Sequence, residues 1–169
     1  MSYYLVILDQ FNCSPYNYTV MLGHLDEHQM NNLLSSQVIG RLACSADEQP
    51  YLVPLTYTFD GSYIYGQTKE GMKLDVLRKN PNVCFEVDQM TDMANWQSVI
   101  VLGVFEELAG EEAEKARHIL YNRVFPMKTS STVHTHEHHV ESAISDAERI
   151  KPIVYRIKIK EKSGRFEKR

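Results

Sequence analysis

The chain has 169 residues, a formal net charge of -4 and 43% hydrophobic residues, which fits one globular domain over residues 1–169 and excludes a disordered or coiled-coil protein. Charged residues of both signs are interspersed without a basic stripe, which argues against nucleic acid as a partner.

The N-terminal residues, to about 23, are interpreted as an arm. Their apolar run from Tyr3 to Leu8 is far shorter than a membrane span and follows no basic region. The three cysteines are odd in number and lack C-x-x-C spacing, which indicates reduced thiols. We therefore expect a cytoplasmic protein with no membrane partner.

The first predicted element is a short amphipathic helix over 26–36, for which Asp26 is a good N-cap. From Val38 the pattern changes to that of strands, because "VIGRLACS" and "PYLVPLTYTF" are rich in β-branched and aromatic residues and flank the polar turn "ADEQ". Asp60 and Gly61 mark a second tight turn, which leads into the strand "SYIYGQ".

A short helix is predicted from Met72 until Asn80-Pro81, where proline stops it. The runs "NVCFEVD" and "WQSVIVLGVFEEL" are further strands, and Gly103 marks a bend or bulge in the longer one. A third helix fits "EEAEKARHILYNRVF", and "PIVYRIKIKE" alternates like a half-exposed strand. Six such strands with tight turns favour a mainly β fold, a small β-barrel with peripheral helices. The alternative is a two-layer α+β sandwich.

The segment "IYGQTKEGMKLD" is a candidate anion site between a strand and a helix. Gly66 permits close approach to the backbone, Thr68 offers a hydroxyl, and Gly71 precedes a helix whose free N–H groups favour an anion. Lys73 would add a positive charge. The alternative is a simple turn, with Lys73 as a solvated surface residue.

The strand "VPLTY" is a second candidate. Pro54 removes a ladder donor, so neighbouring backbone groups and the Thr56 hydroxyl are free for the polar rim of a planar heterocycle. The alternative is an edge strand that proline protects.

These motifs in this order resemble the pyridoxamine 5'-phosphate oxidase-related flavoproteins with the FMN-binding split-barrel fold, and most resemble the branch of the nitroimidazole-resistance (Nim-like) proteins. The resemblance runs from about Ile39 to Leu108 and returns in "PIVYRIKIKEKSGR". It implies a homodimer with two FMN molecules at the subunit interface.

By motif position, the resemblance assigns three groups of cofactor-binding residues. The isoalloxazine ring would be lined by Val53, Pro54, Leu55, Thr56 and Tyr57; the ribityl phosphate would be surrounded by Gln67, Thr68, Met72 and Lys73; and Trp96, Gln97 and Ser98 would face the flavin across the dimer.

Two departures from the family pattern limit the expected chemistry. Gln67 stands where many relatives have histidine, and "SGRFEKR" lacks the arginine-containing substrate motif of true pyridoxamine phosphate oxidases. Vitamin B6 oxidation is therefore not expected. No catalytic side chain is assigned, because a bound flavin supplies redox chemistry itself.

The segment "VHTHEHHV" is a weak candidate metal site, because His134, His136 and His138 would share one face of a strand. The alternative is a solvated loop that binds metal only adventitiously.

The leading functional hypothesis is an FMN-dependent oxidoreductase that takes electrons from NADH, NADPH or another donor and acts on a small molecule. The alternatives are a non-catalytic flavin- or haem-binding sensor or storage protein, and a structural dimer module without cofactor.

Overall fold

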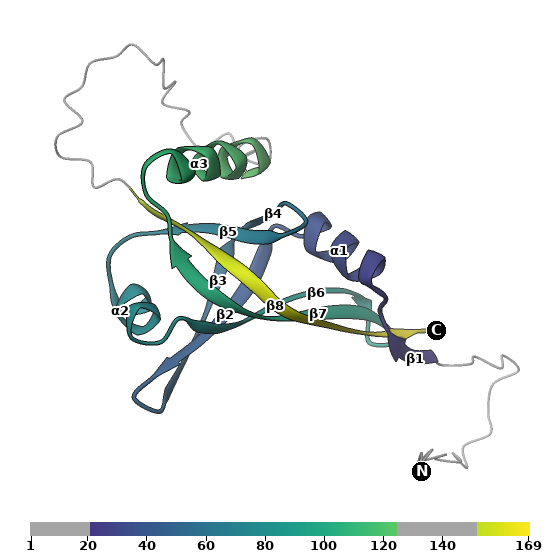
Figure 1. The fold of residues 1–169 in the computed structure, drawn as a ribbon. Helices are drawn as coiled ribbons and strands as arrows, with labels where there is room; N and C mark the ends of the chain where they lie inside the picture. Colours follow the sequence, from purple (N-terminus) through teal and green to yellow (C-terminus); the bar gives the residue numbers. More distant parts are fainter. Residues whose placement is uncertain (1–20, 125–151) are drawn as a thin grey trace, which may run out of the picture.

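Eight strands form one antiparallel sheet within residues 21–124 and 152–169, which are the residues that the computed structural model describes (Figure 1). The spatial order is β3-β2-β6-β7-β8-β5-β4, and β1 pairs with β8. The strands are β1 (Met21–His24), β2 (Ile39–Ala46), β3 (Gln49–Thr56), β4 (Thr58–Phe59), β5 (Tyr63–Thr68), β6 (Asn82–Asp92), β7 (Asn95–Glu107) and β8 (Ile153–Lys168).

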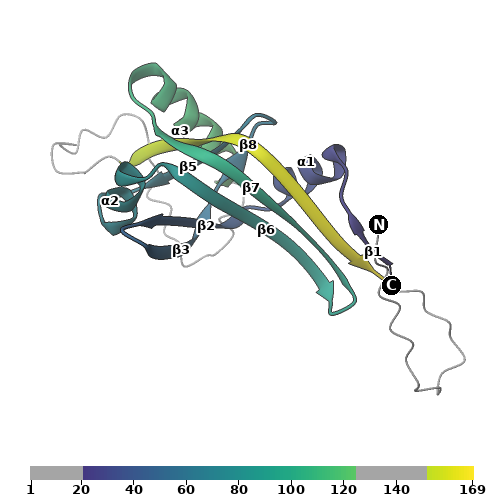
Figure 2. The same cartoon turned by 60° about the horizontal axis from the view of Figure 1, so that its bottom comes forward.

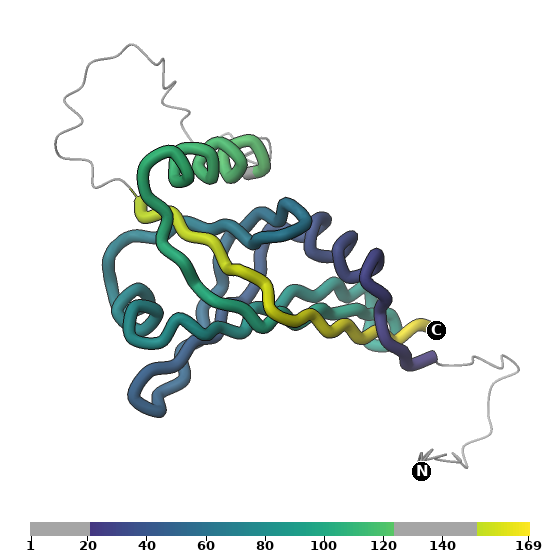
Figure 3. The backbone as a smooth tube through the Cα atoms, viewed as in Figure 1, coloured from purple at the N-terminus to yellow at the C-terminus, as the bar shows by residue number. Residues whose placement is uncertain are grey.

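The sheet curls around the core, because β3 and β5 contact each other although they lie near opposite ends of the strand order. The backbone trace in Figure 3 shows β8 running beside β7 along the length of the sheet. The predicted mainly β barrel with peripheral helices is confirmed, in preference to the two-layer sandwich.

Three helices of the described residues lie outside the sheet: α1 (Glu27–Ser36), α2 (Met72–Lys79) and α3 (Gly110–Val124). Asp26 caps α1 as predicted, in a capping box with Gln29, and α2 ends before Asn80-Pro81 as predicted. In the described part of the chain, no helix is long and apolar enough to cross a membrane.

Both predicted hairpin turns are present. Asp47 and Glu48 connect β2 to β3 with φ values of 52° and 62°, which is the backbone of a two-residue hairpin turn. Between β4 and β5, the carboxylate of Asp60 accepts hydrogen bonds from the N–H groups of Ser62 and Tyr63.

The structure departs from the sequence-based expectation at three strands. Residues 21–24, at the end of the predicted arm, form β1 and pair with residues 165–168 of β8. The run predicted as one strand through Phe59 is divided into β3 and β4 at Tyr57. The last strand continues to Lys168, beyond its predicted end.

Gly103 lies at a register shift between β7 and β8, so the predicted bulge is confirmed. A Cβ atom at Gly103 would lie 2.5 Å from Cγ2 of Ile157, so only glycine allows the two strands to pack this closely.

The hydrophobic core lies between the inner face of the sheet and the helices α1 and α2. It alternates along each strand as expected, with Val83, Phe85 and Val87 of β6 facing Val99 and Val101 of β7. The side chains between these positions point to the opposite, outer face of the sheet.

Candidate functional site

The segment between β5 and α2 has the backbone of an anion site. Gly71 is the N-cap of α2, has φ 150° and makes no side-chain capping bond. Its carbonyl oxygen accepts hydrogen bonds from the N–H groups of Leu74 and Asp75, whereas those of Met72 and Lys73 have no partner in the described part of the chain. We call Thr68, Gly71, Met72 and Lys73 the α2 cradle.

Lys73 is half-buried rather than a solvated surface residue. Its Nζ lies 5.9 Å from the ring centroid of Tyr155, and it forms no ion pair with any described residue. Burial lowers the pKa of Lys73, an effect that the neighbouring Cys44 partly opposes. A half-buried ammonium group without a carboxylate partner leaves its charge available to an anion.

Gly66 has a different role from the one predicted. A Cβ atom at this position would lie 2.5 Å from the hydroxyl of Tyr155, so Gly66 makes room for that side chain and not for a ligand. Tyr155 is fully buried, its hydroxyl has no hydrogen-bond partner among the described residues, and burial raises its pKa. The polar interior beside Lys73 therefore includes Tyr155 and Cys44.

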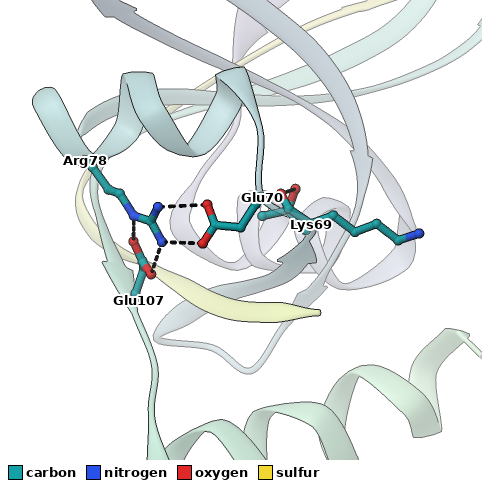
Figure 4. A network of polar contacts seen from close by, with 5 residues as sticks. Lys69, Glu70, Arg78 and Glu107 are labelled. Carbon is teal, nitrogen blue, oxygen red and sulfur yellow. Dashed lines mark hydrogen bonds and ion pairs between the residues drawn. The ribbon is translucent and has the colours of Figure 1, made fainter. Parts of the chain in front are cut away.

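Arg78 holds the chain that leads into the α2 cradle (Figure 4). Its guanidinium donates to both carboxylate oxygens of Glu70, at 2.8 and 2.9 Å, and to both of Glu107, at 2.7 and 3.1 Å. These bonds lower the pKa of Glu70. The guanidinium thereby connects the residue before Gly71 to the end of β7.

The strand β3 is an edge of the sheet, as the presence of Pro54 predicted, because among the described strands it pairs only with β2. Leu55 and Tyr57 are buried in the core, and the Tyr57 hydroxyl donates to the carbonyl of Leu34 at 2.7 Å. The exposed side chains of this segment are Pro54 and Thr56. Val53, Leu55 and Tyr57 therefore offer a ligand mainly their backbone.

Trp96, Gln97 and Ser98 lie at the start of β7, at the end of the sheet opposite α2 (Figure 2). Eleven residue steps of β7 separate Trp96 from Glu107, roughly 35 Å at the rise of an extended strand. Trp96 Nε1 donates to Glu167 at 3.0 Å, and Gln97 Nε2 donates to Gln89 at 2.8 Å. One chain therefore does not bring these residues to the α2 cradle.

The predicted metal candidates His134, His136 and His138 lie outside the described residues. Within 21–124 and 152–169, no three side chains of histidine, cysteine, aspartate or glutamate are placed to hold a metal ion together.

Comparison with known protein families identifies the family of this chain. The sequence profile of the family described as pyridoxamine 5'-phosphate oxidase matches residues 26–166. The chain belongs to this family. The match includes the described elements from α1 to β8, apart from the last two residues of β8, so the resemblance seen in the sequence motifs is confirmed.

Among curated sequences, an uncharacterized protein of Rhizobium meliloti (strain 1021) is 33% identical over 84 residues. That alignment covers 50% of this chain and 56% of the relative, so the chain spans only about half the length of this relative.

Solved structures share the fold. The chain is similar to a FAD-binding protein from Mesorhizobium loti, with 26% identity, a TM-score of 0.71 and coverage of 89% of this chain and 100% of that chain. It is also similar to a FAD-binding protein from Mycobacterium smegmatis, with 23% identity, a TM-score of 0.59 and coverage of 85% and 98%. The predicted split-barrel architecture is thus confirmed.

Sequence reasoning about this family member missed three residues beside the α2 cradle: Cys44, Arg78 and Tyr155. The alternation of β8 correctly placed Tyr155 on the apolar face. Its neighbour Lys73 is 82 positions away in the sequence, so no local pattern could have indicated the contact.

Proposed function

We propose that the chain is a cytoplasmic, homodimeric FMN-dependent oxidoreductase that acts on a small molecule at the subunit interface. The observation that carries this proposal is the α2 cradle in a member of the pyridoxamine 5'-phosphate oxidase family. Within the described part of the chain, its Lys73 ammonium group has no ion-pair partner and two of its backbone N–H groups are free.

The donors of the α2 cradle fit a phosphate monoester. The N–H groups of Met72 and Lys73 lie at the positive end of the α2 dipole, and the Lys73 ammonium adds a full charge. Thr68 supplies a hydroxyl at the end of β5. These donors are assigned to the phosphate of FMN alone, and other residues would recognise the isoalloxazine ring.

The free edge of β3 is suited to the ring. Backbone groups beside Pro54 and the exposed Thr56 can pair with the polar rim of an isoalloxazine. The bound flavin would supply the transfer of electrons or hydride, and the residues of the chain would bind it, orient it and limit its contact with water. The similarity to FAD-binding proteins supports flavin as the class of cofactor.

The outer face of the sheet supports the homodimer. An apolar row crosses the neighbouring strands β3, β2, β6 and β7, and its residues in that order are Leu52, Ala43, Cys84 and Leu102. The side chains at the two ends of the row, Leu52 and Leu102, are 64% and 46% exposed. An apolar row of this length is typical of a subunit interface. An isologous contact of this face with the two sheets antiparallel would bring the Trp96 end of one subunit toward the α2 end of the other.

The deciding experiment is an absorbance spectrum of the purified protein, followed by mass identification of the compound released on denaturation. Released FMN would support the proposal. FAD, haem or no chromophore, together with a melting temperature that FMN does not change, would contradict it.

Turnover is tested separately by stopped-flow mixing of the FMN-loaded protein with NADH or NADPH. Bleaching of the flavin absorbance followed by reoxidation on addition of an acceptor supports an oxidoreductase. A flavin that no donor reduces would indicate the non-catalytic alternative, a flavin sensor or storage protein.

A further inference from the structure

A cavity of about 600 Å³ lies at the end of the sheet opposite the α2 cradle. Its walls come from β1, the start of α1, the hairpin between β6 and β7, and the end of β8, which converge in Figure 2. This volume is within the range of small-molecule sites. The cavity is lined in part by Gln29, Gln89, Gln97 and Phe166.

The floor of the cavity continues the core-facing side of the sheet. Gln89, Gln97 and Phe166 are directly opposite one another on β6, β7 and β8. In the row below, Val87 and Val99 are fully buried. The hydrophobic core therefore ends at the valines, and the next row presents two carboxamides and an aromatic ring.

The two carboxamides leave one carbonyl group and one NH₂ group unused. Gln97 Nε2 donates to Gln89 Oε1 at 2.8 Å, and neither side chain makes another hydrogen bond within residues 21–124 and 152–169. The pair consequently presents a C=O of Gln97 beside an NH₂ of Gln89. This pattern is complementary to a ligand that carries N–H and C=O side by side.

Two aromatic side chains of the cavity are held in place. Phe166 packs against Gly23 of β1, where a Cβ atom would lie 2.6 Å from the ring. The Trp96 indole is fixed by its bond to Glu167. The charged lining residues, Glu167 and Lys168, are of opposite sign, so the cavity offers no net charge to attract an ion.

We propose that this cavity binds a small uncharged aromatic carboxamide or lactam, with its amide edge paired to Gln89 and Gln97 and its ring against Phe166. The proposal assigns Gln97, which the resemblance places at the flavin, to this separate cavity and leaves Ser98 to the proposed flavin site. Gln97 faces the core side of β7, whereas Ser98 and Ile100 face the outer side.

Titration of the full chain with benzamide, followed by NMR of ¹⁵N-labelled side-chain amides, tests the proposal. Benzamide should shift the NH₂ signals of Gln89 and Gln97, whereas benzoate, which has the same shape but no N–H and a negative charge, should bind at least ten-fold more weakly. Gln89→Leu should weaken benzamide binding at least ten-fold, and Gln49→Leu, at an exposed position of β3 outside the cavity, should leave it unchanged.

Several outcomes would overturn the proposal. Equal affinity for benzoate, no shift at millimolar benzamide, or equal effects of the two leucine variants would each show that the carboxamides do not select the ligand. Displacement of benzamide by FMN would show that the cavity is not a separate site. If Gln89→Leu does not fold, Gln89→Glu keeps the shape, removes the NH₂ donor and should cause the same loss.

Discussion

Replacing Lys73 with methionine removes one charge from the α2 cradle and keeps a side chain of similar length. Lys73 has no carboxylate partner among the described residues, so the substitution breaks no ion pair there. Any loss of phosphate binding would then report the lysine itself.

The expected magnitude follows from the chemistry of the contact. A hydrogen bond to a charged group contributes about 1.5–3 kcal/mol, so Lys73→Met should raise the Kd for FMN roughly 10- to 150-fold. Riboflavin has the same ring without the phosphate. Its Kd should be the same for the variant and the wild-type protein.

Quenching of flavin fluorescence during titration measures both constants. Lys79→Met is the matched control, because Lys79 lies on the same helix but is exposed and paired with Asp47. This control should bind FMN as the wild type does. Lys73 does not bind the phosphate of FMN if Lys73→Met leaves the FMN affinity unchanged, or if it weakens FMN and riboflavin equally.

Three further predictions concern stability and assembly. Burial lowers the pKa of Lys73, so between that lowered pKa and the ordinary value of 10.5 the unfolded chain binds more protons and the free energy of unfolding rises with pH. Denaturant unfolding should therefore show Lys73→Met more stable than the wild type at pH 7, and the difference should shrink toward pH 10.5. Tyr57→Phe leaves the carbonyl of Leu34 unpaired and should cost about 1–2 kcal/mol in the same assay; no loss would mean that the bond contributes nothing. Leu102→Asp places a charge in the apolar row and should convert a dimer to a monomer in light scattering, whereas an unchanged mass would exclude this face as the interface.

The local parts of the fold were predictable because each rests on neighbouring residues. Asp26 and Gln29 form a capping box, Pro81 follows the end of α2, and Gly103 is placed at the bulge. In each case the signal lies within a few positions of the structure that it specifies. Strand alternation was predictable for the same reason.

The pairings between distant segments were not predictable. β1 pairs with the last residues of β8, more than 140 positions away, and nothing in "MLGH" indicates that partner. One predicted strand is divided at Tyr57, whose hydroxyl donates to the carbonyl of Leu34 in α1. Both features involve contacts between segments that are distant in the sequence, which local propensity does not report.

The candidate site was predictable as chemistry but not as geometry. The glycine before α2 and the lysine in its first turn made an anion site one of two interpretations of the sequence, with a simple turn as the alternative, and the family resemblance favoured the anion site. The sequence did not show that Gly66 accommodates Tyr155, that Arg78 joins Glu70 to Glu107, or that Gln97 faces a cavity. Each of these depends on which strands become neighbours.

The free edge of β3 also bears on how the newly made chain avoids aggregation. An unpaired strand edge can recruit the edge of another molecule and start an open-ended stack. Pro50 and Pro54 both lie in β3 and have no N–H to donate, so a foreign strand could not form a continuous ladder along it. The same backbone that is proposed to border a flavin would thus be a poor template for an unwanted strand before any cofactor is bound.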